Sequence, residues 1–169
     1  HKMNFISPYI ELPKKLTVRQ NLVVYGKLYN VSNLNKQIDY LSNKLRLNKL
    51  LDNVTGELSS GQKNRVSLAK ALINNPTVLL LDEPTASLDP ETGDFVRTFL
   101  ENYKKENKIS VLLASHNMDE VKRLCSSVLM MKGGVIVDSG TPDHLISKHG
   151  RTNLEEVFLE LVRNKNEFN

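Results

Sequence analysis

A short apolar segment that ends in two acids constrains this chain more than any other feature. Residues 78–81 are Val-Leu-Leu-Leu, and Asp82-Glu83-Pro84 follows them directly. An apolar segment without polar alternation is typical of a strand buried on both faces of a parallel sheet. Carboxylates at its end do not stabilise a sheet, because burying an unpaired charge costs free energy. They suit metal binding and water activation, although the two acids could instead only cap the next turn.

The rest of the chain places similar strands around this one. Strands are predicted at 3–7, 77–81 and 110–114, with amphipathic helices between them, and Ser115-His116 follows the last strand. Alternating strands and helices indicate an α/β fold with a parallel sheet. Ligands in such folds bind at the carboxyl ends of the strands.

Composition excludes several classes of protein. Of the 169 residues, 40% are hydrophobic and 25% charged, which is typical of a globular chain. The net charge of +4 is small, and no dense block of Lys and Arg indicates a nucleic-acid partner. A single cysteine, Cys125, excludes an intrachain disulfide. No apolar run approaches the roughly 20 residues of a membrane-spanning helix, and no signal peptide is visible.

Three residues at the strand ends are candidates for chemistry. Asp82 could hold Mg²⁺ directly or through its waters. Glu83 could act as general base toward an attacking water. His116 could stabilise charge that develops on a transferred phosphoryl group, although a lone histidine is more often structural.

A string of small polar residues opens the helix before the central strand. Leu58-Ser59-Ser60-Gly61-Gln62 would place free N–H groups and a hydroxyl at a helix N-terminus, which is a ready site for an anion. The alternative is a plain capping box. Residues 87–89, Ser-Leu-Asp, follow the two acids and could be another cap.

The order of these elements along the chain indicates a protein family more specifically than any single element does. The order resembles the nucleotide-binding domain of ATP-binding cassette (ABC) proteins, and the resemblance covers essentially the whole chain. By this resemblance residues 58–62 are the signature motif, 78–83 the Walker B strand, 87–89 the D-loop and His116 the switch histidine. The implied fold is a partial P-loop NTPase-like α/β core with a parallel sheet and an inserted helical subdomain.

The resemblance also implies a domain organisation. Residues 1–8 would be a remnant of the ATPase core and 9–57 the helical subdomain. Residues 58–140 would hold the signature motif and the rest of the core, and 141–169 the C-terminal helices.

In the family, the cofactors are ATP and Mg²⁺, and two such domains face each other head to tail. The resemblance therefore assigns Asp82 to the metal, and Glu83 and His116 to catalysis. It assigns contacts with the nucleotide or across the dimer to five further residues: Ser59, Ser60, Gly61, Gln62 and Asp89. The implied partners are a second nucleotide-binding domain, identical or different, and a membrane permease that residues 9–57 contact. The protein would lie peripherally at the cytoplasmic face of the membrane.

The sequence departs from the family pattern in three places. The Gly-rich loop G-x-x-x-x-G-K-[ST] does not occur, and we expect the chain to begin after it. This polypeptide alone is therefore predicted neither to bind ATP tightly nor to hydrolyse it, and to expose apolar surface and an unpaired strand edge. Spacing to residues 16–18 puts Pro8 where the family has its Q-loop glutamine, so either the coupling contact is altered or the register is shifted. Ser60 stands where glycine is commonest in the signature.

Several functions remain in competition. Residues 153–161, Asn-Leu-Glu-Glu-Val-Phe-Leu-Glu-Leu, resemble the tail of ATPases that drive ABC-2-type exporters, although an ordinary packing helix would look the same. No long heptad run supports the coiled-coil relatives of the family. The expected function is the ATPase subunit of a transporter, and this tail favours an exporter. The alternatives are a non-catalytic interaction module and a non-transport ABC ATPase.

Overall fold

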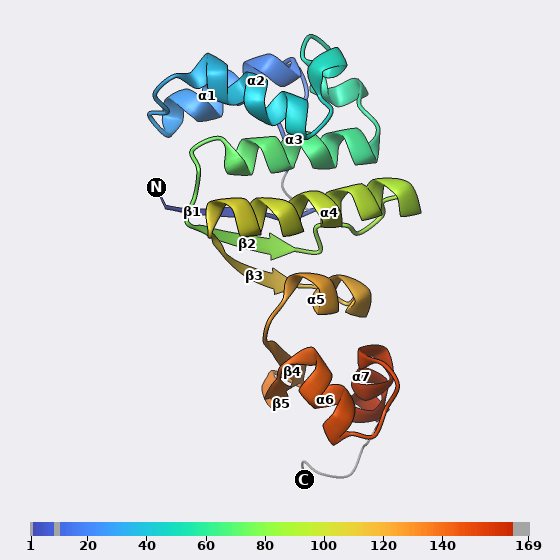
Figure 1. Ribbon diagram of the computed structural model, residues 1–169. Coiled ribbons are helices and arrows are strands. Elements are labelled where there is room, and N and C mark those ends of the chain that lie inside the picture. The colour runs from blue at the N-terminus through green and yellow to red at the C-terminus, as the bar shows by residue number, and fades with distance from the viewer. Residues whose placement is uncertain (1, 9–10, 164–169) are drawn as a thin grey trace. The chain divides into compact units, whose positions relative to one another are not determined.

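The computed structural model describes residues 2–8 and 11–163, so parts of the predicted ranges 1–8, 9–57 and 141–169 lie outside it (Figure 1). The chain forms two compact units, His1–Ala114 and Ser115–Asn169. The division of the chain into the four predicted segments stays a prediction.

The first unit is built on a three-stranded parallel sheet. Its strands are β1 (Met3–Ile6), β2 (Val78–Asp82) and β3 (Ser110–Ala114), in the order β1-β2-β3. Phe5 lies beside Leu80, and Leu80 lies beside Leu112. The predicted α/β fold with a parallel sheet is confirmed.

Four helices accompany this sheet, with two short 3-10 turns. They are α1 (Val18–Leu28), α2 (Leu34–Lys44), α3 (Ser60–Leu72) and α4 (Pro90–Asn107), with the turns at Asn48–Leu50 and Thr55–Glu57. Local capping explains where the first helix starts. The Thr17 hydroxyl accepts from the Gln20 N–H, and the Gln20 side chain accepts from the Thr17 N–H, which forms a capping box.

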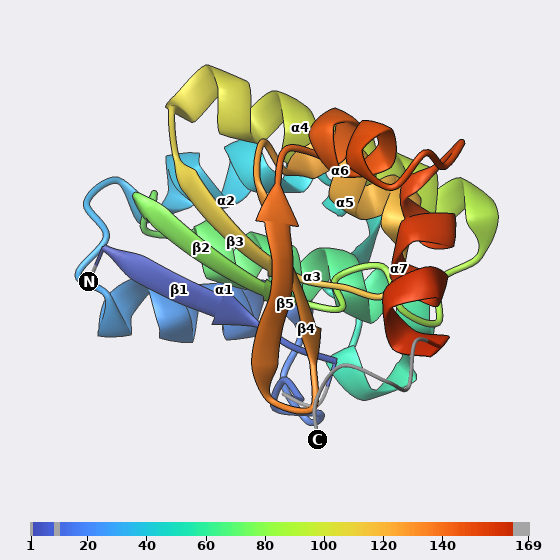
Figure 2. The same cartoon turned by 90° about the horizontal axis from the view of Figure 1, so that it is seen from below.

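The two faces of the sheet differ in burial. Leu79 and Leu81 are fully buried on the face that α3 and α4 cover, and Figure 2 shows the strands in front of these helices. On the other face Met3 and Leu112 are 60% and 65% exposed. The prediction that the strands now seen as β2 and β3 are buried on both faces is therefore wrong for this chain, because the helices of the unit cover only one side of the sheet. The predicted exposed apolar surface is confirmed.

The second unit combines a hairpin with three helices. Its elements are α5 (Met118–Leu124), β4 (Val128–Lys132), β5 (Val135–Gly140), α6 (Pro142–Lys148) and α7 (Leu154–Arg163). The strands pair antiparallel around Gly133-Gly134, both of which have positive φ. Glycine adopts such a backbone without steric cost, which explains why two glycines occupy this turn.

The helix formed by the exporter-like tail is a packed element. Leu154 and Val157 of α7 are buried, and α7 contacts α5, α6 and β4 within its unit. The Lys132 ammonium donates to the Leu161 carbonyl at 2.9 Å, near the end of the helix. This segment thus has the packing role that the sequence left open. No helix in the described parts of the chain has the length and apolar character needed to cross a bilayer.

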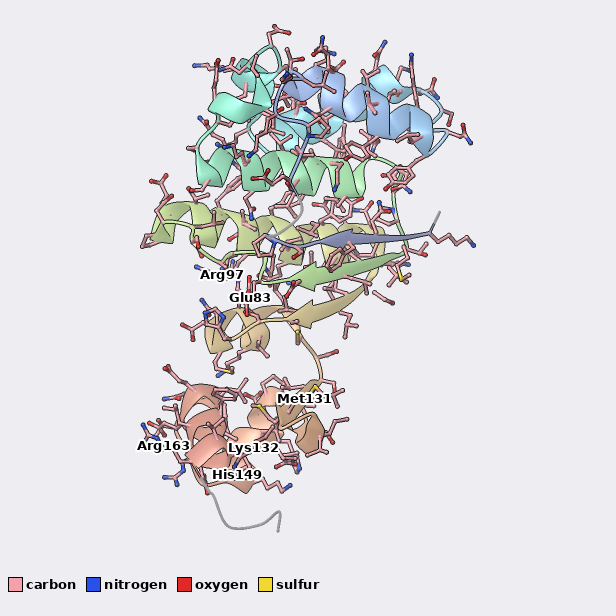
Figure 3. All side chains as sticks on the ribbon, turned by 180° about the vertical axis from the view of Figure 1, so that it is seen from behind. Glu83, Arg97, Met131, Lys132, His149 and Arg163 are labelled. Atoms are coloured by element: carbon pink, nitrogen blue, oxygen red, sulfur yellow. The ribbon has the colours of Figure 1, made fainter. Side chains whose placement is uncertain are left out.

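A charged cluster joins β5 to α6 and α7. Asp138 is only 8% exposed and accepts from the Lys148 ammonium at 2.7 Å. The His149 ring, labelled in Figure 3, lies 2.8 Å from the same carboxylate and 3.6 Å from Glu160. The hydrogen bonds from Lys148 and His149 lower the pKa of Asp138 to about 2.

We expect Asp138→Asn to destabilise the protein in a pH-dependent way. A carboxyl whose pKa is lowered by folding stabilises the fold fully above its unfolded pKa of about 3.9, and this contribution is lost as the pH falls through about 2. The variant should therefore melt a few degrees below the unchanged chain at pH 5, and the difference should shrink toward pH 2. Thermal unfolding followed by circular dichroism measures this. Asp143→Asn, at an exposed position, is the control for removing one charge, and a pH-independent effect of Asp138→Asn would contradict the account.

Candidate functional site

The end of β2 carries the first candidate. Asp82 is the last residue of the strand, and its Oδ2 accepts from the Ser7 hydroxyl at 3.0 Å. Ser7 is buried and directly follows β1, whose last residue, Ile6, pairs with Leu81. Parallel pairing therefore places this hydroxyl beside the carboxylate. The sequence reasoning missed Ser7, because nothing local distinguishes a serine at a strand end.

Glu83 leaves the strand in an unusual backbone conformation. Its φ is +47°, in the left-handed region that disfavours residues with a Cβ by about 1–2 kcal/mol. The Glu83 N–H donates to the Ala114 carbonyl at 2.8 Å, which ties the turn to the end of β3. Figure 3 shows Glu83 beyond the end of β2. Strained backbone of this kind is found preferentially at functional sites, and no local pattern in the sequence predicts it.

A pocket of about 280 Å³ joins several of the predicted segments within the first unit. Its lining combines Ser7 and Pro8 after β1, Ser60 and Lys63 of α3, and Glu83 with Ser87 after β2. The structure thus brings the predicted general base and one signature residue to the same concave surface. It also places Pro8 there, at the predicted strand end.

The signature string opens α3 with a complete capping box. The Ser59 hydroxyl accepts from the Gln62 N–H at 3.3 Å, and the Gln62 Oε1 accepts from the Ser59 N–H at 2.9 Å. Ser60 and Gly61 form the first turn of the helix. The structural alternative raised from the sequence is therefore present, and it leaves the N-terminal dipole of a 13-residue helix available to an anion.

Gly61 and Asp89 meet at the same residue of α4. A Cβ on Gly61 would lie 3.1 Å from Thr92 Cγ2, so the glycine also permits close packing. The Thr92 N–H donates to Asp89 Oδ1 at 2.9 Å, which caps α4. Hydrogen bonds from Thr92 lower the pKa of Asp89 below its ordinary value. The two residues of the predicted signature and D-loop are thus linked through one neighbour.

His116 belongs to the second unit, in the loop between β3 and α5. It is exposed and lies two residues beyond Ala114, the last residue of β3. The predicted position after a strand end is confirmed. Its place beside a phosphate stays a prediction.

Asn64 is a further residue that the sequence did not reveal. Its Nδ2 donates to the Pro84 carbonyl at 2.7 Å and so holds the turn after Glu83 against α3. The interaction spans twenty residues of sequence, and an asparagine inside a helix carries no local mark of such a role.

The end of β2 offers one carboxylate that is suited to a metal ion. Within the described residues, no three His, Cys, Asp or Glu side chains gather to hold an ion. Mg²⁺ commonly uses one or two carboxylates and completes its octahedron with waters and phosphate oxygens. Asp82, oriented by Ser7, provides one such carboxylate.

Comparison with known proteins identifies relatives for most of the chain. The family model described as ABC transporter matches residues 1–86. The chain is 32% identical to the ABC transporter ATP-binding protein NatA of Bacillus subtilis (strain 168), over 88% of this chain and 61% of the relative. It is 34% identical to a Nod factor export ATP-binding protein I of Rhizobium sp. (strain N33), over 90% and 51%. It is 35% identical to the methionine import ATP-binding protein MetN 1 of Bacillus cereus (strain ATCC 10987 / NRS 248), over 87% and 45%. The chain therefore spans about half the length of these relatives.

Solved structures share the fold. An ATP-binding subunit of an ABC transporter has a TM-score of 0.82 and 24% identity, over 95% of this chain and 68% of the other. A dimeric post-hydrolysis state of the ATP-binding cassette MJ0796 with ADP and Pi has a TM-score of 0.75 and 23% identity, over 83% and 62%. CbiO1 from Clostridium perfringens, part of the ABC transporter complex CbiONQ, has a TM-score of 0.72 and 32% identity, over 87% and 59%.

We expect Asn64→Ala to destabilise the first unit by about 1 kcal/mol, because it removes the hydrogen bond to the Pro84 carbonyl. Urea unfolding measures this. The matched control is Asn48→Ala, which removes an exposed hydrogen bond to Asn43 and should change stability by less than about 0.5 kcal/mol. Equal effects of the two substitutions would contradict a role for Asn64 in holding the turn.

Proposed function

Since the chain belongs to the ABC transporter family, as part of an ATP-binding domain, we propose that it supplies the signature motif and the Walker B end of an ATP-hydrolysing transporter subunit. One observation carries this proposal. The carboxyl end of the parallel sheet carries Asp82, which accepts a hydrogen bond from Ser7, and Glu83, which has a positive φ. Glu83 also lines the same pocket as signature residue Ser60. This is the edge at which α/β sheets bind ligands.

The proposed roles follow the chemistry of each group. Asp82 would hold Mg²⁺, which neutralises charge on the nucleotide phosphates. The Glu83 carboxylate would orient the attacking water and accept its proton. The imidazole of His116 would donate a hydrogen bond toward the γ-phosphate, where negative charge develops.

We further propose that the intact subunit works as a pair. Ser59 and Gly61 at the start of α3 would contact the γ-phosphate held by the second domain, and Ser60 and Gln62 would complete that helix end. Asp89 would lie at the contact between the domains. The dimeric, ADP-bound structure that this fold resembles supports an arrangement of this kind. The second domain would be a copy of this one or a related chain.

The second proposed partner is a membrane permease, which would place the protein peripherally at the cytoplasmic face. Residues 9–57 would contact it. Relatives are named for export and for import, so the direction is proposed from the chain itself. The segment that forms α7 is similar to the tail of ABC-2-type exporters, and this similarity favours export.

A non-catalytic interaction module is the competing function. It rests on the absence of a G-x-x-x-x-G-K-[ST] string from the sequence. Sequencing the gene upstream of the codon for residue 1 separates the two proposals. An in-frame Gly-rich loop favours the ATPase subunit, whereas a start codon at Met3 favours the module.

The 169-residue chain alone is expected to show no ATP hydrolysis above background. The backbone N–H groups and lysine of a Gly-rich loop provide most contacts to the β- and γ-phosphates, and the sequence has no such loop. Single-turnover assays with labelled ATP measure this. Robust turnover that Glu83→Gln abolishes would show that the chain needs no Gly-rich loop.

In a complete reading frame that contains the loop, Glu83→Gln is expected to lower the rate of ATP hydrolysis by about 10²–10⁴-fold, because the amide cannot accept the proton of water. ATP binding should persist, since the substitution preserves the shape of the side chain. Steady-state hydrolysis and equilibrium nucleotide binding measure the two effects. Glu91→Gln, at an exposed position in the first turn of α4, is the control and should leave the rate unchanged. An unchanged rate in Glu83→Gln would remove Glu83 from the proposed mechanism.

A further inference from the structure

Glu120 is a buried acid in the second unit that the proposed function does not use. It is 0% exposed, and within residues 2–8 and 11–163 it is the only Asp or Glu that is buried. Burial of a carboxylate is costly unless hydrogen bonds compensate it. Glu120 therefore requires a structural or functional reason for its place.

A ring of three hydrogen bonds connects Glu120 to the turn before α5. The Ser115 hydroxyl donates to Glu120 Oε2 at 2.7 Å and accepts from the Asn117 N–H at 3.1 Å. The Asn117 Oδ1 in turn accepts from the Glu120 N–H at 3.0 Å. His116 lies in the sequence between Ser115 and Asn117, which are two of the three residues in this ring.

This arrangement differs from the capping box at the start of α3. In the box at Ser59, the third helical residue, Gln62, accepts directly from the N–H of the cap. At α5 the carboxylate of the third residue reaches the cap N–H only through the Ser115 hydroxyl, which relays the interaction. The hydrogen bonds therefore hold Ser115 and Asn117, the residues on both sides of His116.

Capping alone does not explain the burial. Glu156 occupies the equivalent place in α7, where its N–H donates to Asn153 and its carboxylate accepts from Thr152. Glu156 is exposed, so a helix start of this chain can be capped by a solvated acid. The Glu120 side chain is buried and its bond with Ser115 is partly buried, so water competes less for this bond than for the exposed bonds of Glu156.

We propose that Glu120 is a positioning residue that, through Ser115, fixes the turn presenting His116. The rigidity of the turn is independent of nucleotide, whereas its use toward a phosphate rests on the function proposed above. The second carboxylate oxygen, Oε1, is buried without a hydrogen-bond partner among the described residues, so Oε2 and its bond to Ser115 carry the positioning.

The test is nuclear magnetic resonance of the 169-residue chain without nucleotide, read at the backbone amide of His116, which takes no part in the three hydrogen bonds. The unchanged chain should show an order parameter near 0.85, and Glu120→Ala should lower it below about 0.6. Amide exchange at His116 should rise about tenfold or more in Glu120→Ala. Glu120→Gln keeps an oxygen acceptor for Ser115 and should restore both values.

Glu156→Ala is the matched control. It should loosen the first turn of α7 and leave His116 unchanged. An unchanged His116 in Glu120→Ala, or failure of Glu120→Gln to restore its order, would overturn the proposal. If Glu120→Ala does not fold, Ser115→Ala removes only the relaying hydroxyl, and the same release of His116 is expected; an ordered His116 there would equally overturn it.

A second measurement separates this proposal from the proposed function. In a complete protein that hydrolyses ATP, Glu120→Ala should lower kcat and leave the KM for ATP unchanged, with kcat restored in Glu120→Gln. A complete protein that fails to hydrolyse ATP would refute the ATPase proposal and leave the resonance result intact. Hydrolysis with an unaffected kcat in Glu120→Ala would refute the positioning role.

Discussion

Parallel pairing of β1, β2 and β3 is the constraint on which the candidate site depends. The register sets Ile6, Leu81 and Leu113 side by side, so the residues that follow emerge at one edge. Successive side chains of a strand point to opposite faces, and a slip of one residue would exchange the two sets. Such a slip would move the Asp82 carboxylate to the face where Leu79 and Leu81 pack against helices. The apolar core therefore fixes where the acid lies.

Beyond the strand, long-range hydrogen bonds hold a backbone that local preference disfavours. Glu83 has an unfavourable positive φ, and its N–H donates a hydrogen bond to the carbonyl of Ala114. Asn64 holds the next part of the turn through Pro84. Each bond comes from a different element, so the position of the Glu83 carboxylate depends on β3 and α3 together. A water-activating carboxylate benefits from this rigidity, because catalysis requires a defined geometry.

Features with local causes were predictable, and those that depend on distant contacts were not. The capping box raised from residues 58–62 is decided within four residues, and Ser59 and Gln62 form it in the structure. The contacts of Ser7 with Asp82 and of Asn64 with Pro84 arise only when separated segments pair. The error about strand burial has the same origin. An apolar run shows that both faces of a strand can be buried, but the exposure of Leu112 depends on whether an element covers it.

The structural and functional interpretations of the helix starts are compatible. When the Ser59 hydroxyl accepts from Gln62, it uses a lone pair and keeps its proton for donation. Asp89 caps α4 with Oδ1, and a carboxylate has a second oxygen for further contacts. Capping also orders the first turn of a helix, whose N–H groups and dipole attract anions. A residue that stabilises a helix start therefore also prepares it for a phosphate, and evidence for capping does not count against binding.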